Sequence, residues 1–416
     1  MSTHSFSYDR GIAVASWDYP IIEFHFDLLR IDRRTGESSA EVTTLVQNGH
    51  PGPDMVHRAR LNLVSTRARA DYVKHLESRL PETYYDWPAK IEEAAWEVVE
   101  AQRRGRPAML LRDAAEPEGA SWALSPLLLA RDPVVLFGDG GTAKSYLALA
   151  LARAIHINEP IAGLTPSRPL RTALCDFEWQ EWPHSRRLRA LHGPGALPDL
   201  LYVPCQTEGP LSHQIDRLRA IFNEHQIEYA VIDSVALACD GPPEEAQAAL
   251  GFFQALARLE VGSALIAHVN REGDTNKPFG SAFWHNSARA TWFVKRHQEV
   301  NAKGLEVGLF NRKVNDGAFS PPIGLRFEFS ELRTTIKGVD VRDVPELAGN
   351  VPLKSRIAHA LGKDAMTYLQ LSEQLEVPVN SVTQTVTRWE GRTFRKITAT
   401  QDGVHRVALM GGDTVT

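Results

Sequence analysis

Residues 137–152 read FGDGGTAKSYLALALA, and this stretch decides the fold of the central part of the chain. The apolar run PVVLF leads into it, and its last residues have the spacing of an amphipathic helix. Gly138, Lys144 and Ser145 fit the pattern G-x-x-x-x-G-K-[ST], a strand-to-helix loop whose backbone N–H groups cradle phosphate oxygens. Ala143 stands where that pattern has its second glycine. The stretch predicts a nucleotide site, and a glycine-rich turn without a ligand is the alternative.

The loop residues have separate expected roles. Lys144 is expected to reach the β- and γ-phosphates, and the Ser145 hydroxyl to bind Mg²⁺. A glycine at position 143 would avoid a Cβ near the phosphates and would permit a positive φ. Ala143 adds one methyl group, which is tolerated if the residue begins the helix with a negative φ. We therefore expect a working ATP site formed by the whole loop: Gly138, Asp139, Gly140, Gly141, Thr142, Ala143, Lys144, Ser145 and Tyr146.

Length and composition limit the function classes. The chain has 416 residues, which is too long for one typical domain, and its formal net charge of -5 gives no overall basic field. Contacts to nucleic acid must therefore come from local patches. The three cysteines lack C-x-x-C spacing, which argues against a zinc site. No signal-peptide pattern or stretch of ~18 apolar residues occurs, so we expect a soluble, cytoplasmic protein with no membrane partner.

Three zones of different pattern follow one another. The first alternates like strands and then shows two helices, which predicts an α+β domain. In the second, short apolar runs alternate with helices, which predicts a mostly parallel sheet with helices on both faces. The third has three helices and a hairpin that turns at Asp402-Gly403, the pattern of a winged helix-turn-helix. The expected bounds are 1–106, a linker at 107–121, 122–335, a linker at 336–350, and 351–412.

Two acidic residues follow strands downstream of the loop. The run YAVIDSV carries Asp233 at a strand tip beside the expected phosphate loop, where it can hold Mg²⁺ through water together with Ser145. Glu178 closes the strand TALCDFEW and is expected to orient the attacking water as a general base. Asp176 is the rival for that role. A solvated glutamate at a strand end is the alternative for Glu178.

The order of these motifs, followed by LIAHVNREG and GSAFWHNSAR, resembles that of RecA-type ATPases. The similarity points to the branch that contains plasmid RepA and DnaB-like hexameric replicative helicases, and it covers about residues 122–330. It implies a RecA-like P-loop core and a homo-oligomeric ring, usually a hexamer, with ATP sites between protomers.

The resemblance also implies roles for two further residues. His268 matches the polar residue that senses the γ-phosphate, although a histidine at a strand edge can equally be a surface group. Arg289 matches an arginine that reaches into the ATP site of the neighbouring subunit as a finger, where a fixed guanidinium suits the charge that develops on the γ-phosphoryl group.

A second motif of the resemblance is incomplete. FNRKVNDG is similar to a K-x-R-x-G strand of DnaB-type proteins, in which Lys313 fits the lysine but Asn315 replaces the arginine. Arg289 is therefore the expected finger. A solvated strand-edge charge is the alternative for each candidate, and the reserves are Arg296, Arg312 and Lys313.

The C-terminal zone has a locally basic face. In a winged helix the third helix enters the major groove and the hairpin contacts the backbone of DNA. Docking of a protein on the same fold is the alternative. The expected nucleic-acid contacts are Gln384, Arg388, Arg392, Arg395, Lys396 and Arg406.

Together these patterns predict a nucleic-acid-dependent ATPase that uses ATP and Mg²⁺. The first hypothesis is a hexameric DNA helicase or translocase of a plasmid- or phage-type replication module, acting on single-stranded DNA. The second is an ATP-controlled DNA-binding regulator, loader or recombination mediator that does not unwind.

Overall fold

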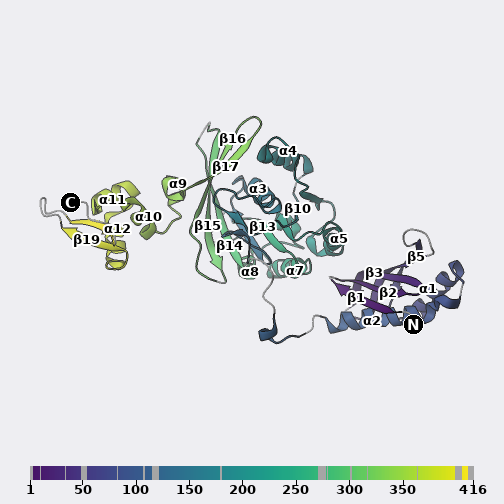
Figure 1. The fold of residues 1–416 in the computed structure, drawn as a ribbon. Helices are drawn as coiled ribbons and strands as arrows, with labels where there is room; N and C mark the ends of the chain where they lie inside the picture. The colour runs from purple at the N-terminus through teal and green to yellow at the C-terminus, as the bar shows by residue number, and fades with distance from the viewer. Residues whose placement is uncertain are drawn as a thin grey trace. The chain divides into compact units, whose positions relative to one another are not determined.

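The chain divides into two compact units, Met1–Glu118 and Gly119–Thr416 (Figure 1). The computed structural model describes residues 3–9, 11–32, 34–47, 54–81, 83–105, 108–114, 121–178, 180–269, 278, 280–299, 302–315, 317–362, 364–398 and 405–410.

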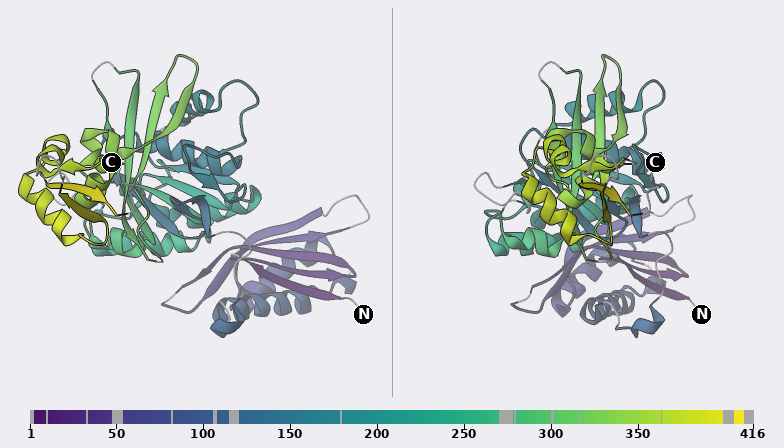
Figure 2. Two further views of the ribbon diagram at one scale, coloured as in Figure 1. Left: turned by 60° about the vertical axis from the view of Figure 1, so that its left-hand side comes forward. Right: turned by 90° about the vertical axis from the view of Figure 1, so that its left-hand side faces the viewer.

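The first unit is an antiparallel sheet with two helices against it (Figure 2). Alternate strand residues such as Phe24 and Val42 are fully buried, and they pack with Leu76 and Ile91 from the helices. Ser65 caps the first helix by accepting a hydrogen bond from the Ala68 N–H. In order along the sheet, the strands are β1 (His4–Asp9), β2 (Ile12–Asp18), β3 (Ile21–Ile31), β4 (Ser38–Val46) and β5 (Asp54–Asn62), and the helices are α1 (Thr66–Arg79) and α2 (Trp87–Arg104).

The second unit is built on a nine-stranded mixed sheet. Its first six strands are parallel, and the last three run as antiparallel neighbours. The order across the sheet is β11 (Leu201–Pro204), β10 (Thr172–Asp176), β12 (Tyr229–Asp233), β13 (Gly262–His268), β8 (Pro133–Gly138), β14 (Ala290–His297), β15 (Gly304–Val314), β16 (Ile323–Phe329) and β17 (Thr334–Val339). This sheet confirms the predicted α/β core.

Helices cover both faces of this sheet (Figure 1). Strand β8 in its middle is buried on both sides. Val135 and Phe137 face one core cluster, whereas Val134 and Leu136 face the other, because successive strand residues point to opposite faces. The first cluster packs with α5 (Leu211–Glu224), α6 (Val235–Ala238), α7 (Ala246–Ala257) and α8 (Ala282–Ser287), and the second with α3 (Lys144–His156) and α4 (Glu181–His192). A small sheet of β7 (Leu128–Leu129), β6 (Trp122–Ser125) and β9 (Thr165–Pro166) lies beside them.

The sheet continues beyond the boundary expected at residue 335. Strand β17 ends at Val339, and the next segment forms η3 (Val341–Asp343) and α9 (Pro345–Ala348). Val341 and Leu347 belong to the core cluster that contains Phe137. Much of the segment expected to be a linker at 336–350 is therefore folded onto the sheet.

The last part of the chain has a separate small core. Ile357, Leu371, Val382 and Phe394 are each fully buried within it. Its elements are α10 (Leu353–Leu361), β18 (Met366–Thr367), α11 (Tyr368–Leu375), α12 (Val379–Arg388), β19 (Phe394–Thr398) and β20 (His405–Leu409). Strands β19 and β20 pair antiparallel, and the turn predicted at Asp402-Gly403 lies outside the described residues. Within the described ranges, no helix has the length and apolar character needed to cross a membrane.

Candidate nucleotide site

The loop between β8 and α3 has the shape of a phosphate cradle. A Cβ on Gly138 would clash with the carbonyl oxygen of Val294, so only glycine allows β8 and β14 to approach here. Gly141 has a φ of 74° and Ala143 a φ of 62°. A negative φ at Ala143, the condition under which its methyl group was expected to be tolerated, is therefore not met: the alanine takes the left-handed conformation for which the usual glycine is suited.

Lys144 is held inside the loop at the start of α3. Its Nζ donates hydrogen bonds to the carbonyl oxygens of Gly138 (2.8 Å) and Asp139 (2.7 Å), and it lies 3.2 Å from Oγ1 of Thr142. Burial lowers the pKa of Lys144 to about 8, against the opposing influence of Asp233 and Asp139. The ammonium is thus placed on the inner side of the loop, where phosphate oxygens would bind.

Asp233 ends β12 next to the loop and is almost completely buried. The hydroxyl of Ser145 hydrogen-bonds its carboxylate, while the Oδ1 atom has no hydrogen-bond partner among the described residues. Burial raises the pKa of Asp233 to about 6, and the nearby Glu178 and Asp176 act in the same direction. A buried carboxylate oxygen without a partner beside a serine hydroxyl fits a hard divalent cation or its water ligand.

The two acidic residues at and just beyond the end of β10 have different surroundings. Asp176 is buried, and its Oδ2 lies 3.0 Å from Nε2 of His184 and accepts a hydrogen bond of 3.1 Å from the Tyr202 hydroxyl. Glu178 is exposed and lines the same pocket as Lys144 and Asp233. Asp176 is thus committed to contacts beneath the site, and Glu178 is the carboxylate on its open side.

His268 ends β13 and lines the same pocket. It is half-buried, and this burial together with Lys144 lowers its pKa, whereas Glu178 opposes the shift. A neutral imidazole at this place has one donor and one acceptor nitrogen for a phosphate or a water.

Arg289, the expected arginine finger, lies away from the pocket of its own chain. Arg289 directly precedes β14, its side chain is half exposed, and its Nε lies 3.5 Å from Oδ1 of Asp132. Since β14 runs parallel to β8 and Ala290 pairs with Val134, Arg289 lies at the sheet edge opposite the phosphate loop. It does not line the pocket of its own chain.

Two of the reserve residues are engaged in structural contacts. The Nζ of Lys313 donates hydrogen bonds to the carbonyl oxygens of His285, Asn286 and Ala288, at and just beyond the end of α8. The guanidinium of Arg312 lies 5.5 Å from the ring centre of Phe293.

Two arginines of the same chain reach the pocket. Arg296, expected as a reserve finger in trans, instead lines the pocket of its own chain, and its Nη1 donates to the Gly141 carbonyl oxygen at 2.6 Å. Arg187 of α4 also lines it, with its guanidinium 5.5 Å from the ring centre of Tyr146. Arg187 is not among the site residues expected from the sequence, and the run HSRRLRALH shortly after Glu178 is the signal that would have indicated it.

These side chains surround one open pocket of about 350 Å³. Cations, acidic groups and the rim ring of Phe329 therefore face a shared space, which suits a phosphorylated ligand with an aromatic base. The complete lining is Gly141, Thr142, Ala143, Lys144, Ser145, Tyr146, Glu178, Arg187, Asp233, Ile266, His268, Arg296 and Phe329.

Residues 101–274 match a protein-family model described as AAA domain. The match covers less than half of the chain, and with the phosphate loop between β8 and α3 it supports a P-loop ATPase fold for this part. Its fold is RecA-like, with the phosphate loop at the carboxyl end of β8 in the large mixed sheet.

Solved structures with a similar fold include a KaiC-like protein of the hyperthermophilic archaeon Pyrococcus horikoshii OT3. It is 13% identical, with a TM-score of 0.38 over 52% of this chain and 94% of that one. A second solved structure, itself an ATPase domain, is 12% identical, with a TM-score of 0.38 over 50% of this chain and 85% of that one. At this similarity neither structure bears on the function of the ATPase. No curated protein sequence matches the chain.

The six residues expected to contact nucleic acid differ in their exposure. Gln384 and Arg388 are exposed on α12, and Arg392 is exposed in the turn that follows. Lys396 is exposed on β19, and its Nζ forms an ion pair of 2.8 Å with Glu390. The remaining two, Arg395 and Arg406, are partly buried.

Proposed function

We propose that the chain is an ATP-hydrolysing motor that works on DNA, a helicase or translocase that assembles as a hexameric ring. One observation carries the ATPase part: Lys144, Ser145, Glu178 and Asp233 line a single pocket. The four residue types required for binding a triphosphate, holding Mg²⁺ and activating water come from three different strand-end segments.

The geometry supports a division of labour among these groups. Lys144 binds the β- and γ-phosphates at the inner side of the loop. Ser145 and Asp233 would hold Mg²⁺, which supplies neutralisation of the phosphate charge when bound. Glu178 takes the proton from the attacking water as the water oxygen bonds to the γ-phosphorus and the bond to the bridging oxygen breaks. His268 contacts the γ-phosphate, so that release of this phosphate would change the contacts at the end of β13.

The position of Arg289 supports the ring. Its half-exposed guanidinium at the far sheet edge contacts only one exposed carboxylate among its described neighbours. Such a surface pair contributes little stability, so the arginine is available to a neighbouring subunit. In a closed ring, a head-to-tail contact between identical subunits would bring this edge to the next phosphate loop.

ATP hydrolysis with and without single-stranded DNA, measured beside the mass of the ATP-bound assembly, tests the proposal. We expect DNA to stimulate hydrolysis and ATP to favour a hexamer. A protein that hydrolyses ATP at the same rate with and without DNA would contradict the motor, and a monomer in ATP would contradict the ring.

A second candidate is an ATP-controlled DNA-binding regulator, loader or recombination mediator that does not unwind. The exposed side of α12 favours it, since Thr383, Gln384, Thr387 and Arg388 share one helical face and carry groups able to bond base edges. Residues 353–410 also contain eight Lys and Arg against five Asp and Glu, in a chain of net charge -5. This segment would act as a winged helix on duplex DNA.

Strand displacement distinguishes the two candidates. A motor separates a duplex that has a single-stranded tail in an ATP-dependent manner. A regulator binds duplex DNA, loses affinity on Gln384→Ala with Arg388→Ala, and separates no strands. Single-stranded stimulation of the ATPase without displacement would favour the second candidate.

A further inference from the structure

The nucleotide pocket contains a guanidinium from its own chain. Arg296 lines the pocket together with Lys144 and Ser145. Its Nη1 donates a 2.6 Å hydrogen bond to the carbonyl oxygen of Gly141, and a second contact from Nη2 reaches the Gln298 side chain. Two anchors hold the planar guanidinium at the edge of the phosphate loop.

Strand register places Arg296 there. Strand β14 is the parallel neighbour of β8, and Phe293 pairs with Phe137. Arg296 lies three residues after Phe293, and Gly140 lies three residues after Phe137. Both residues therefore lie at the carboxyl-end edge of the sheet. The close approach of β14 to Gly138 fixes this pairing, because no larger residue fits between them.

The charge around the pocket calls for an anion. Lys144, Arg187 and Arg296 converge on it, against the carboxylates of Glu178 and Asp233. The two carboxylates face the metal and water positions of the proposed function. The three cations repel one another, and an anion bound between them would relieve this repulsion.

We propose that Arg296 binds the phosphate tail of ATP in cis, within the chain that also supplies Lys144. The inference rests on the proposed ATPase function and gives Arg296 a phosphate-binding role within its own chain, distinct from the role that Arg289 would have from a neighbour. Each chain then binds ATP through its own lysine and arginine, and a neighbour adds only the group needed for fast turnover.

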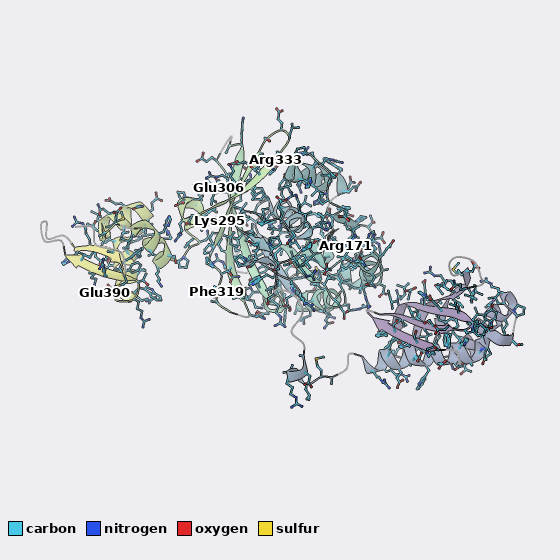
Figure 3. All side chains as sticks on the ribbon, viewed as in Figure 1. Arg171, Lys295, Glu306, Phe319, Arg333 and Glu390 are labelled. Carbon is cyan, nitrogen blue, oxygen red and sulfur yellow. The ribbon has the colours of Figure 1, made fainter. Side chains whose placement is uncertain are left out.

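The first test compares Arg296→Ala with the wild-type full chain. We expect kcat/KM for ATP to fall about 10- to 100-fold, the range for loss of one charge-assisted hydrogen bond. Lys295→Ala is the matched control, since Lys295 (Figure 3) precedes Arg296 on β14, points to the other face and does not line the pocket. Unchanged kcat/KM in Arg296→Ala, or an equal loss in Lys295→Ala, would overturn the inference.

The second test asks which chain supplies the arginine. Lys144→Ala chains are mixed with Arg296→Ala chains under conditions of subunit exchange, and ATP turnover is measured. If Arg296 acts in cis, every site lacks one group and the mixture is no more active than the Arg296→Ala chains alone. If it acted in trans, about a quarter of the sites in a random ring would regain both groups, and recovered turnover would overturn the inference.

A parallel mixture separates this inference from the proposed function. Lys144→Ala mixed with Arg289→Ala is expected to recover turnover, because Arg289 acts from the neighbour. Failure of this mixture counts against the shared ring sites and leaves the assignment of Arg296 to be decided by the kcat/KM comparison, because the mixing test needs sites shared between chains. Absence of ATP hydrolysis in the wild-type chain would instead remove the proposed function.

Discussion

The two ends of β14 carry arginines with opposite surroundings. Arg296 at the carboxyl end lies against the phosphate loop, whereas Arg289 before the amino end faces away from it with one exposed partner. Seven residues of strand separate them by roughly 23 Å. One rigid strand therefore connects the pocket of its own chain to the surface proposed to serve a neighbour's pocket, and a shift of the strand would move both.

The largest expected effect is at Lys144, the group that binds phosphate at the pocket end. Lys144→Ala should abolish ATP turnover in a phosphate-release assay, because no other ammonium lines the pocket among the described residues. The matched control is Lys337→Ala, which removes an exposed lysine paired with Glu328. Wild-type turnover in Lys144→Ala would refute the ATP site. The difference between the two ends of β14 would then have no functional meaning.

The next largest effect is expected at Arg289, which directly precedes the amino end of β14. Arg289→Ala should lower kcat by about 10³-fold if the guanidinium stabilises charge on a neighbour's γ-phosphoryl group. ATP affinity, measured by equilibrium binding, should change little, because Arg289 does not line its own pocket. Asp132→Ala removes the partner of Arg289 at the same edge and should retain turnover. A loss of ATP affinity in Arg289→Ala would show that Arg289 binds ATP in its own chain. The arginines at the two ends of β14 would then have the same role.

A third variant, Asp233→Asn, tests whether the buried carboxylate of the pocket lowers the free energy of unfolding. Burial raises the pKa of Asp233 to about 6 from its ordinary value of 3.8, so the folded state disfavours the ionised carboxylate. The free energy of unfolding should therefore decrease as pH rises from about 4 to 6, by on the order of 2–3 kcal/mol. Asp233→Asn should remove this decrease, raise Tm at pH 7 without nucleotide, and lose Mg²⁺-dependent turnover.

Thermal unfolding at pH 4 and pH 7 checks this sign. Asp132→Asn is the control, because the Asp132 carboxylate is half exposed. If Asp233→Asn has a lower Tm than the wild type at pH 7, the buried charge is stabilised by its neighbours rather than costly. The main argument that the Asp233 carboxylate binds a cation would then fail.

The sequence was sufficient for the parts of this architecture that depend on local pattern. The loop, its strand and helix, and the strand-end positions of Asp233 and His268 follow from apolar runs and spacing, and the parallel order of strands brings them together. The position of Arg296 does not follow in this way. It depends on which strand pairs with β8, and the two partners of its hydrogen bond are 155 residues apart in the chain.

The conformation of Ala143 was also outside the reach of pattern. A lone alanine gives no sign of a positive φ, because most alanines avoid it and only the surrounding loop imposes it. Similarly, the equal chemistry of Asp176 and Glu178 conceals that one is buried against His184 while the other lines the pocket. These distinctions are set by tertiary packing.

The smallest effect tests how much strain the pocket end holds. Ala143→Gly should relieve the left-handed strain of about 1 kcal/mol, partly offset by the greater freedom of glycine in the unfolded chain. We expect a Tm increase of a few degrees at most. Glu376→Gly, at a residue with a φ of 50° after α11, is the matched control for backbone relief away from the pocket. If both variants gain stability but only Ala143→Gly also binds ATP more tightly, the methyl group obstructs the phosphate cradle. If ATP affinity is unchanged while stability rises, the loop already has the geometry that glycine would give it, and the alanine costs the fold rather than the ligand.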